Sequence, residues 1–342
     1  MRPLAAIILA AGKGTRMRSK MPKVTFKIAD KPMIQRVVDT ALKLDCDTIC
    51  TVVGFQKETV IAALEDCDRL KFVEQTEQLG TGHAVMITES TFANQDLDIM
   101  ILCGDVPLLT ENTLRKIYDT HLAENATCTV LTAFLEDAGK YGRIMRDESN
   151  RVKGIVEYKD ASETQRRIQE FNTGIYCFNS LELFSALKET NNTNKQGEYY
   201  LTDALSVLYN QGKVVSSVVL DDLMEVSGVN SQEQLAELEE CFLDRIRKHW
   251  LNNGVVMHNP TSIYIGDEVI IKQDVEIDGH CIIKGKSILE EGSYIGPNSL
   301  IINSKIGEET ILQGYNVICS AYIQEHQIVP YKELIEEEDP YE

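Results

Sequence analysis

The sequence predicts an α/β protein of two parts: an open, mostly parallel sheet with helices, and then a stack of short parallel strands. Three patterns lead to this fold class. Apolar stretches alternate with amphipathic ones up to about residue 225, one long amphipathic segment follows, and from residue 265 aliphatic residues recur every six positions. With 342 residues and 43% hydrophobic content, the chain is long enough to form more than one core.

The first domain is expected over residues 1–228. Strands are predicted at Leu4–Ala11, Thr48–Val53, Lys71–Val73, Asp98–Cys103 and Thr127–Ala133, and helices at Met33–Leu44, Glu58–Glu65, Thr81–Thr88 and Glu111–Ala123. This alternation is typical of a Rossmann-like domain with a mixed, mostly parallel sheet. Such sheets bind ligands beyond the carboxyl ends of their strands. Two polar loops, 12–23 and 104–107, follow predicted strands and are therefore candidate sites.

A linker helix is expected over residues 229–252. Apolar residues recur there every three or four positions, as one face of a helix requires, at Leu235, Leu238, Phe242, Ile246 and Trp250. Ser231 followed by Gln234 fits a capping box at the start of this helix.

A short β-helix is expected over residues 253–325, because aliphatic anchors recur there with a period of six. One residue is skipped after Ile301, and the anchors are Ile265, Ile271, Ile277, Ile283, Leu289, Ile295, Ile301, Ile306, Leu312 and Ile318. This spacing is the hexapeptide repeat of parallel β-helices. Similarity to the hexapeptide family implies a left-handed helix with three hexads per coil. Residues 326–342 are expected to form an acidic tail, and its last stretch, EEEDPYE, is expected to be disordered.

The loop after the first strand is rich in glycine and basic residues. Gly12 and Gly14 follow the apolar strand, and the first 31 residues contain eight Lys or Arg but one acid, Asp30. Glycines let backbone N–H groups approach phosphate oxygens, and the cations neutralise them. The loop lacks the G-x-x-x-x-G-K-[ST] pattern of a Walker loop. It is not a dinucleotide fingerprint either, because the position of the third glycine is Met17. It predicts a polyphosphate site, and the alternative is a plain turn with solvated basic residues.

Composition narrows the possible partners. The formal net charge of −19 argues against nucleic acid, which needs a basic binding face. Nine scattered cysteines without metal-ligand spacing favour a reducing, cytoplasmic environment over a disulfide framework. No apolar run approaches the roughly 20 residues of a membrane span. We therefore expect a cytoplasmic protein that binds neither membrane nor nucleic acid.

Several ordered segments resemble one enzyme family. The stretch LAAGKGTRM, followed by Pro22 and Lys23, looks like the signature of sugar-nucleotide pyrophosphorylases. Further matches follow in order: VEQTEQLGTGHAV (73–85), LCGDVPLL (102–109), YGRI (141–144), IVEYKDA (155–161), EFNTGIYCF (170–178), QGEYYLTDAL (196–205) and GVNSQEQLAELE (228–239). Together they resemble the bacterial N-acetylglucosamine-1-phosphate uridylyltransferases over residues 4 to about 325.

The resemblance implies transfer of UMP from UTP to N-acetylglucosamine 1-phosphate with release of pyrophosphate, for the synthesis of cell-envelope precursors. Arg16 and Lys23 would be catalytic, neutralising the triphosphate and the incoming phosphate. Amides of Gln75 and Gln78 suit the edge of uracil, because they both donate and accept hydrogen bonds. The nucleotide-binding positions implied are Leu9, Ala10, Ala11, Gly12, Gly14, Gln75, Gln78, Gly80, Thr81, Cys103 and Gly104.

The resemblance also implies a sugar site and a metal site. Gly142, Glu157, Asn172 and Thr173 match sugar-binding positions, and Asp105 and Asn230 match the ligands of Mg²⁺. Taken without the resemblance, four of the implied site residues have a plainer interpretation. Asp105 would be a turn residue, Gln75 and Gln78 would be surface amides, and Glu157 would belong to a surface charge pair with Lys159.

The chain departs from the family in two places. Cys103 stands where the family usually has Tyr, which removes a ring near the nucleotide. The β-helix is short, whereas the acetyltransferase site of the bifunctional family members needs more coils, so we expect no acetyl transfer. Such short solenoids usually associate, and a homo-oligomer, with a trimer favoured, is expected.

Three other functions fit parts of the sequence. The same fold could serve another sugar 1-phosphate with UTP. A hexapeptide acyltransferase would need longer coils with acyl-donor and base residues. A non-catalytic regulatory paralogue would tend to have lost the loop lysine or the metal carboxylate, yet Arg16, Lys23, Asp105 and Asn230 are all present.

Overall fold

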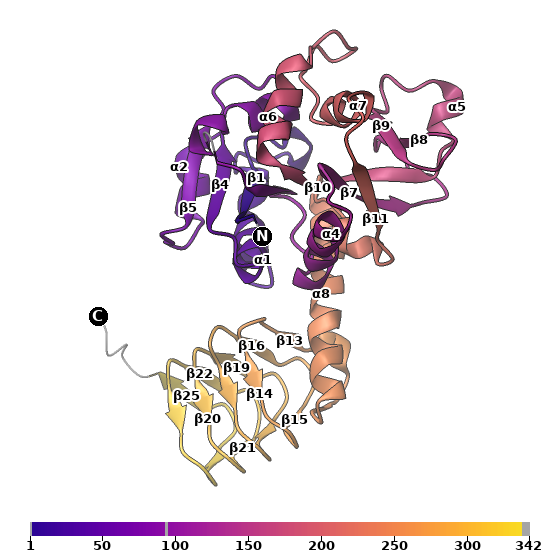
Figure 1. Ribbon diagram of the computed structural model, residues 1–342. Helices are drawn as coiled ribbons and strands as arrows, with labels where there is room; N and C mark the ends of the chain where they lie inside the picture. Colours follow the sequence, from indigo (N-terminus) through magenta and orange to yellow (C-terminus); the bar gives the residue numbers. More distant parts are fainter. Residues whose placement is uncertain (1, 93–94, 337–342) are drawn as a thin grey trace. The chain divides into compact units, whose positions relative to one another are not determined.

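The computed structural model describes residues 2–92 and 95–336 (Figure 1). The chain divides into two compact units. The first contains the chain up to Phe26 and Pro32–Gln234, and the second contains Lys27–Lys31 and the chain from Leu235 onward. Among the described residues, no helix combines the length and apolar character that a membrane crossing requires.

The first unit is built on a mixed sheet with the strand order β11-β7-β10-β6-β1-β4-β5. Neighbouring strands are parallel except around β10, which runs antiparallel to both β6 and β7, and the β8–β9 hairpin pairs with β10. The strands are β1 Leu4–Leu9, β4 Thr48–Val53, β5 Leu70–Glu74, β6 Asp98–Cys103, β7 Cys128–Phe134, β8 Arg143–Arg146, β9 Val152–Val156, β10 Glu170–Asn179 and β11 Val215–Val219. The predicted mixed, mostly parallel sheet is confirmed.

Helices connect these strands: α1 Met33–Lys43, α2 Lys57–Ala62, α3 Thr81–Met86, α4 Glu111–Ala123, α5 Glu163–Arg166, α6 Ser180–Glu189 and α7 Asp203–Asn210. The strand predicted at Leu4–Ala11 ends at Leu9, because the chain turns there into the glycine-rich loop. The helix predicted at Glu58–Glu65 ends at Ala62. Beyond residue 134 the structure adds the β8–β9 hairpin and the long strand β10, whose antiparallel pairing no sequence pattern indicated.

Both faces of the central strand β1 are buried. Ala5 and Ile7 belong to one apolar core, whereas Ala6 and Ile8 belong to another on the opposite face. Successive side chains of a strand point to opposite faces, so a strand between two cores reads as a continuous apolar run. This apolar run is the pattern from which the first strand was predicted.

The long helix α8 spans Gln232–Asn252 and enters the second unit at Leu235. Within that unit, Ile246 and Trp250 pack against the core of the β-helix. The short strands β2 Lys27–Ile28 and β3 Lys31–Pro32 form a hairpin, and the Ala29 N–H donates to the Glu239 carboxylate over 3.0 Å. Asp30 accepts from the Tyr264 hydroxyl over 3.0 Å.

The rest of the second unit is a short left-handed parallel β-helix, whose coils stack on one another in Figure 1. Its strands are β12 Val256–Met257, β13 Tyr264–Ile265, β14 Ile270–Ile271, β15 Glu276–Ile277, β16 Ile282–Lys284, β17 Ile288–Leu289, β18 Tyr294–Ile295, β19 Leu300–Ile302, β20 Lys305–Ile306, β21 Ile311–Leu312, β22 Val317–Cys319, β23 Tyr322–Ile323, β24 Ile328–Val329 and β25 Leu334–Glu336. The ten predicted anchors are all buried inside.

The β-helix continues past its predicted end at residue 325. Ile323 and Val329 are buried anchors, and Ile335 packs against the same core. They were missed because a second residue is skipped between Ile318 and Ile323, at the corner where the first skip occurs. Asn303 and Ser320 occupy that corner with φ of 48° and 49°. Residues 326–336 therefore belong to the β-helix, and the remainder of the predicted tail, 337–342, lies outside the described residues.

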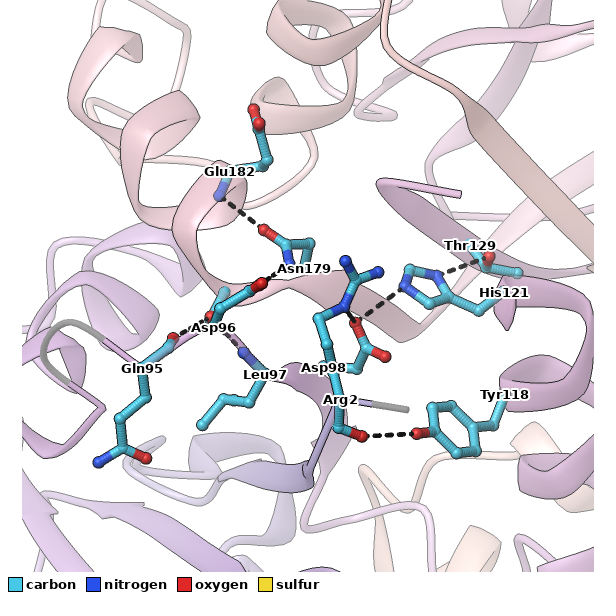
Figure 2. Close-up of polar contacts among 11 residues, drawn as sticks. Arg2, Gln95, Asp96, Leu97, Asp98, Tyr118, His121, Thr129, Asn179 and Glu182 are labelled. Carbon is cyan, nitrogen blue, oxygen red and sulfur yellow. Dashed lines mark hydrogen bonds and ion pairs between the residues drawn. The ribbon is translucent and has the colours of Figure 1, made fainter. Parts of the chain in front are cut away.

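A buried polar network surrounds the amino end of β6 (Figure 2). Asp98 is fully buried, and the Arg2 side chain donates to its Oδ1 over 2.9 Å. His121 Nε2 lies 3.4 Å from the same oxygen, and His121 Nδ1 lies 3.1 Å from the Thr129 hydroxyl. The Tyr118 hydroxyl donates to the Arg2 carbonyl. Arg2 is thus the cation that compensates a buried carboxylate.

Arg2→Ala should lower the free energy of unfolding by about 1–3 kcal/mol, because Asp98 then remains buried without its cation. Urea unfolding measures this, and Asp98→Asn added to Arg2→Ala should recover part of the loss. The control is Arg115→Ala, which removes an exposed ion pair with Glu111 and an exposed hydrogen bond to the Lys43 carbonyl, and it should lower the free energy of unfolding much less. Equal effects of the two arginine variants would contradict the assigned role of Arg2.

Candidate functional site

Two loops of the candidate site begin at adjacent strand ends. Leu9 ends β1 and Cys103 ends β6, and these residues are paired in the parallel register. The Gly104 N–H donates to the Leu9 carbonyl over 3.0 Å, which joins the start of one loop to the other. The loops 12–23 and 104–107 therefore open at the same edge of the sheet, as parallel strands require.

A charged cluster lies at this edge, formed by side chains from three distant parts of the chain. The Lys23 ammonium forms an ion pair with Asp105 and donates to Asn230 Oδ1 over 3.1 Å. The Arg16 guanidinium donates to the same Asn230 oxygen over 2.7 Å. The Val229 N–H donates to the Asp105 carbonyl over 3.1 Å, which holds Asn230 beside it. The two predicted catalytic residues and the two predicted metal ligands thus meet in one place.

Gly14 has a packing role in this cluster that its sequence motif did not reveal. Its φ of 59° is in the left-handed region, and a Cβ there would lie 2.6 Å from the Cβ of Lys23. A side chain at Gly14 would therefore displace Lys23. Around Gly12, by contrast, the described chain has no heavy atom within 4 Å of an added Cβ, so the backbone there is open to a ligand.

A cavity of about 260 Å³, here called the nucleotide-type cavity, lies beside the loop. It brings together most of the predicted nucleotide-binding residues with two others, and its lining is Leu9, Ala11, Gly12, Gln75, Gln78, Gly80, Thr81, Ala84 and Glu198. Gln75 is only 6% exposed, so its interpretation as a surface amide is wrong. Its Nε2 donates to the Gly80 carbonyl over 3.1 Å, and Gln78 Nε2 donates to the Ala11 carbonyl over 2.7 Å. Both amides are held in place at the cavity wall.

The other predicted nucleotide residues lie around the loop. Ala10 is buried, and its N–H donates to the Val52 carbonyl over 2.9 Å. An added Cβ at Gly104 would lie 3.2 Å from Ile34. Burial raises the pKa of the Cys103 thiol to about 12, and its Sγ lies 3.6 Å from the Gly174 carbonyl oxygen. At neutral pH Cys103 is therefore a neutral thiol packed against β10.

The predicted sugar residues converge around the β8–β9 hairpin. Gly142 precedes β8 and Glu157 follows β9, and an added Cβ at Gly142 would lie 3.5 Å from both carboxylate oxygens of Glu157. The Asn172 N–H donates to the Gly142 carbonyl over 2.9 Å. Burial raises the pKa of Glu157. Thr173 is used differently, because its hydroxyl donates to the Leu131 carbonyl inside the sheet.

The structure adds residues to which sequence reasoning gave no role. Glu198 lines the nucleotide-type cavity, and the Thr202 hydroxyl donates to Glu157 Oε1 over 3.1 Å. Both belong to QGEYYLTDAL, a segment recognised as a motif without any assigned function. Gly228 lies against Asp105, since an added Cβ would come within 3.5 Å of its Oδ2. The motif could have marked this segment as functional, but the contacts of Glu198 and Thr202 are visible only in the folded structure.

Comparison with known proteins supports the same interpretation. The profile of the nucleotidyl transferase family matches residues 5–254. The bifunctional protein GlmU of Geobacillus sp. (strain WCH70) is 44% identical over 308 residues, which are 90% of this chain and 67% of that protein. The bifunctional protein GlmU of Heliobacterium modesticaldum is 41% identical over 334 residues, which are 98% and 72% of the two chains. The chain thus spans about two thirds to three quarters of the length of these relatives.

Solved structures resemble the fold. A UDP-glucose pyrophosphorylase complexed with UDP-glucose has a TM-score of 0.57 at 21% identity, and the match covers 72% of this chain and all of the other. The apo form of a UDP-glucose pyrophosphorylase has a TM-score of 0.59 at 19% identity, with the same coverage. At these identities the likeness concerns the fold alone.

Proposed function

The chain belongs to the nucleotidyl transferase family, within its GlmU group, and on that premise we propose that it transfers UMP from UTP to N-acetylglucosamine 1-phosphate. The products are UDP-N-acetylglucosamine, a precursor of the cell envelope, and pyrophosphate. The observation that carries the proposal is the Arg16–Lys23–Asp105–Asn230 cluster beside the cavity walled by Gln75 and Gln78. Cations and cation ligands meet there next to amides suited to a pyrimidine.

In the proposed reaction, a phosphate oxygen of the sugar 1-phosphate attacks the α-phosphorus of UTP in line, and the bond to pyrophosphate breaks. Both reactants are anions, so the protein contributes mainly positioning and charge neutralisation. Lys23 and Arg16 neutralise the phosphates, and the open backbone around Gly12 approaches them. Gln75 and Gln78 read the uracil edge, and Glu157 and Asn172 bind the sugar hydroxyls and the acetamide.

We propose Asp105 and Asn230 as ligands of Mg²⁺. Among the described residues, no cluster of three or more His, Cys, Asp or Glu side chains is arranged to hold a metal ion. Asp105 and Asn230 nevertheless both bond the Lys23 ammonium, so their oxygens converge on one cationic position. An all-oxygen pair suits a hard cation that keeps several waters and takes further oxygens from phosphate. When bound, Mg²⁺ supplies charge neutralisation at the reacting phosphates.

We also propose a cytoplasmic homotrimer. All nine cysteines lie within the described residues and are free thiols, which fits a reducing compartment. On one face of the β-helix, Ile282, Leu300, Val317 and Leu334 are paired in register as a continuous apolar column. Leu334 is 62% exposed and Ile282 is 39% exposed. An apolar column at the surface favours association with another copy.

Purified protein with Mg²⁺, UTP and N-acetylglucosamine 1-phosphate should release pyrophosphate and form UDP-N-acetylglucosamine, and chelation by EDTA should stop turnover. A coupled pyrophosphate assay across several sugar 1-phosphates and nucleoside triphosphates measures this. Faster turnover of another sugar 1-phosphate would show that it, and not N-acetylglucosamine 1-phosphate, is the acceptor. A preference for another nucleotide would overturn the roles of Gln75 and Gln78, and no turnover at all would favour a regulatory protein.

Lys23→Ala should lower kcat by about 10²-fold or more, the effect of removing one charge-stabilising donor from a preorganised site. Lys20→Ala is the matched control, because Lys20 has the same charge in the same loop but is exposed to solvent. Its kcat should stay close to that of the wild type. Equal losses in the two variants would show that the loop acts only as a diffuse basic field.

Light scattering should give the mass of a trimer at micromolar protein concentration. Leu300→Glu places a charge in the middle of the apolar column and should shift the mass towards a monomer. Ile270→Glu adds the same charge to an exposed position in a different sheet and should leave the mass unchanged. A monomeric wild type would rule out the proposed assembly.

A further inference from the structure

Residues 196–202, here called the bridging segment, include Glu198 in the lining of the nucleotide-type cavity and bond neighbouring residues of its wall. The Tyr199 N–H donates to the Leu79 carbonyl over 2.7 Å, and the Gly82 N–H donates to the Tyr199 carbonyl over 2.7 Å. The Leu201 N–H donates to the Thr81 hydroxyl over 3.2 Å. Three hydrogen bonds therefore fix this segment to residues 79–82, where the chain enters α3.

The same segment is tied to the turn that follows β9 on the sugar side. The Tyr200 hydroxyl donates to Asp160 Oδ2 over 3.0 Å. Gln196 joins this contact from both sides, because its Nε2 donates to the Tyr200 hydroxyl and its Oε1 accepts from the Lys159 ammonium. The bridging segment thus connects the wall of the cavity to residues immediately after Glu157.

Thr202 ends the bridging segment and lies directly before the first residue of α7. Its φ of −61° and ψ of −25° are helical, whereas a residue whose hydroxyl caps a helix usually has extended backbone geometry. Within the described chain, its side chain makes no such capping hydrogen bond. Instead the hydroxyl, on a residue only 3% exposed, donates to Glu157 Oε1 over 3.1 Å. The Thr202 hydroxyl is therefore used for Glu157 and not for the start of α7.

Glu157 needs this donor because its surroundings disfavour its charge. Burial is the main cause of its raised pKa, and the nearby acids Asp203, Asp160 and Glu198 raise it further. Tyr176 also lies close enough for the Glu157 charge to raise the pKa of its hydroxyl. The hydrogen bond from Thr202 acts in the opposite direction and lowers the pKa of Glu157. A buried carboxylate bonded in this way is held in one orientation.

We propose that Thr202 is a positioning residue that keeps the Glu157 carboxylate ionised and oriented to accept a hydroxyl of the sugar 1-phosphate. Its own position is set by the bridging segment, whose neighbouring residue Leu201 is bonded to Thr81 in the nucleotide-type cavity. The role of Thr202 in sugar binding rests on the proposed function, whereas its bond to Glu157 is independent of any substrate.

The first arm of the test needs no substrate. Thr202→Val is isosteric and removes the hydroxyl, and Thr202→Ser retains it. Because the folded-state pKa of Glu157 is raised, its contribution to stability is full below its unfolded pKa and is lost as pH rises through the folded pKa. The Thr202 bond offsets this loss for the ionised form. The Tm of Thr202→Val should therefore fall below that of Thr202→Ser at pH 8, and this gap should narrow at pH 4.

A Glu157→Gln background supplies the control for that arm. With the ionisable group removed, the gap in Tm between the Thr202→Val and Thr202→Ser variants should no longer change with pH. A gap that is independent of pH in the parent protein would overturn the proposal that Thr202 keeps Glu157 ionised, because a purely structural effect of the methyl or hydroxyl group does not follow the titration of Glu157.

The second arm measures steady-state kinetics of the full chain. Thr202→Val should raise KM for N-acetylglucosamine 1-phosphate by about tenfold, the scale of one lost hydrogen bond to a charged group, with KM for UTP within about twofold of wild type. The acidic limb of kcat/KM for the sugar phosphate should move to higher pH, and Thr202→Ser should restore both values.

The two arms separate the two ways in which the proposal can fail. Unchanged sugar-phosphate KM in an active Thr202→Val enzyme, or equal increases in both KM values, would overturn the positioning role. If the wild type turns over no sugar 1-phosphate, the proposed function fails, and the unfolding arm still decides whether Thr202 holds Glu157 in its ionised form.

Discussion

The contacts of Lys23 are the interaction on which the candidate site depends. Its ammonium pairs with Asp105 from the loop after β6 and bonds Asn230, which lies just before α8. These residues are separated by 82 and 207 positions in the chain, so the ion pair joins the start, middle and end of the first unit. Gly14 makes room for the Lys23 side chain, and Arg16 bonds the same Asn230 oxygen. Neutralising cations and cation-binding oxygens are thereby placed together before any ligand arrives.

One aspartate begins strand β6 and another follows its end by two residues, and their surroundings give them different roles. Asp98 at the amino end is fully buried and compensated by Arg2, with His121 beside it, so it belongs to the framework. Asp105 follows the carboxyl end, where its side chain keeps 22% of its surface exposed and meets a lysine that phosphates can recruit. Parallel strands open their loops at the carboxyl edge, which is why the second aspartate is the functional one.

The β-helix is built from a repeated local pattern, whereas the site in the first unit depends on contacts that do not repeat. In the β-helix, an aliphatic residue is buried about every six positions, so each strand is placed by the same local pattern. The two skipped residues fall at one corner. In the first unit, the bridging segment makes contacts in two directions that no repeat could encode. Its hydroxyls and backbone N–H groups connect the nucleotide-type cavity to Glu157, so the two halves of the site are held by shared hydrogen bonds.

The sequence by itself determined the regular elements of the architecture, whereas the antiparallel pairing of β10 was seen only in the structure. The parallel strands, the long helix α8 and the ten aliphatic anchors follow from periodicity, because burial of an apolar face imposes a period that is visible locally. The glycine-rich basic loop and the motif resemblance also identified Lys23, Asp105 and Asn230 as candidates. Only the tertiary structure showed that Gly14 leaves room for the Lys23 side chain, that Gln75 is buried at a cavity wall, and that Thr202 bonds Glu157. Each outcome depends on which side chains the fold places next to one another. Thr202 and Glu157, for example, are 45 positions apart, and no local pattern shows that they meet.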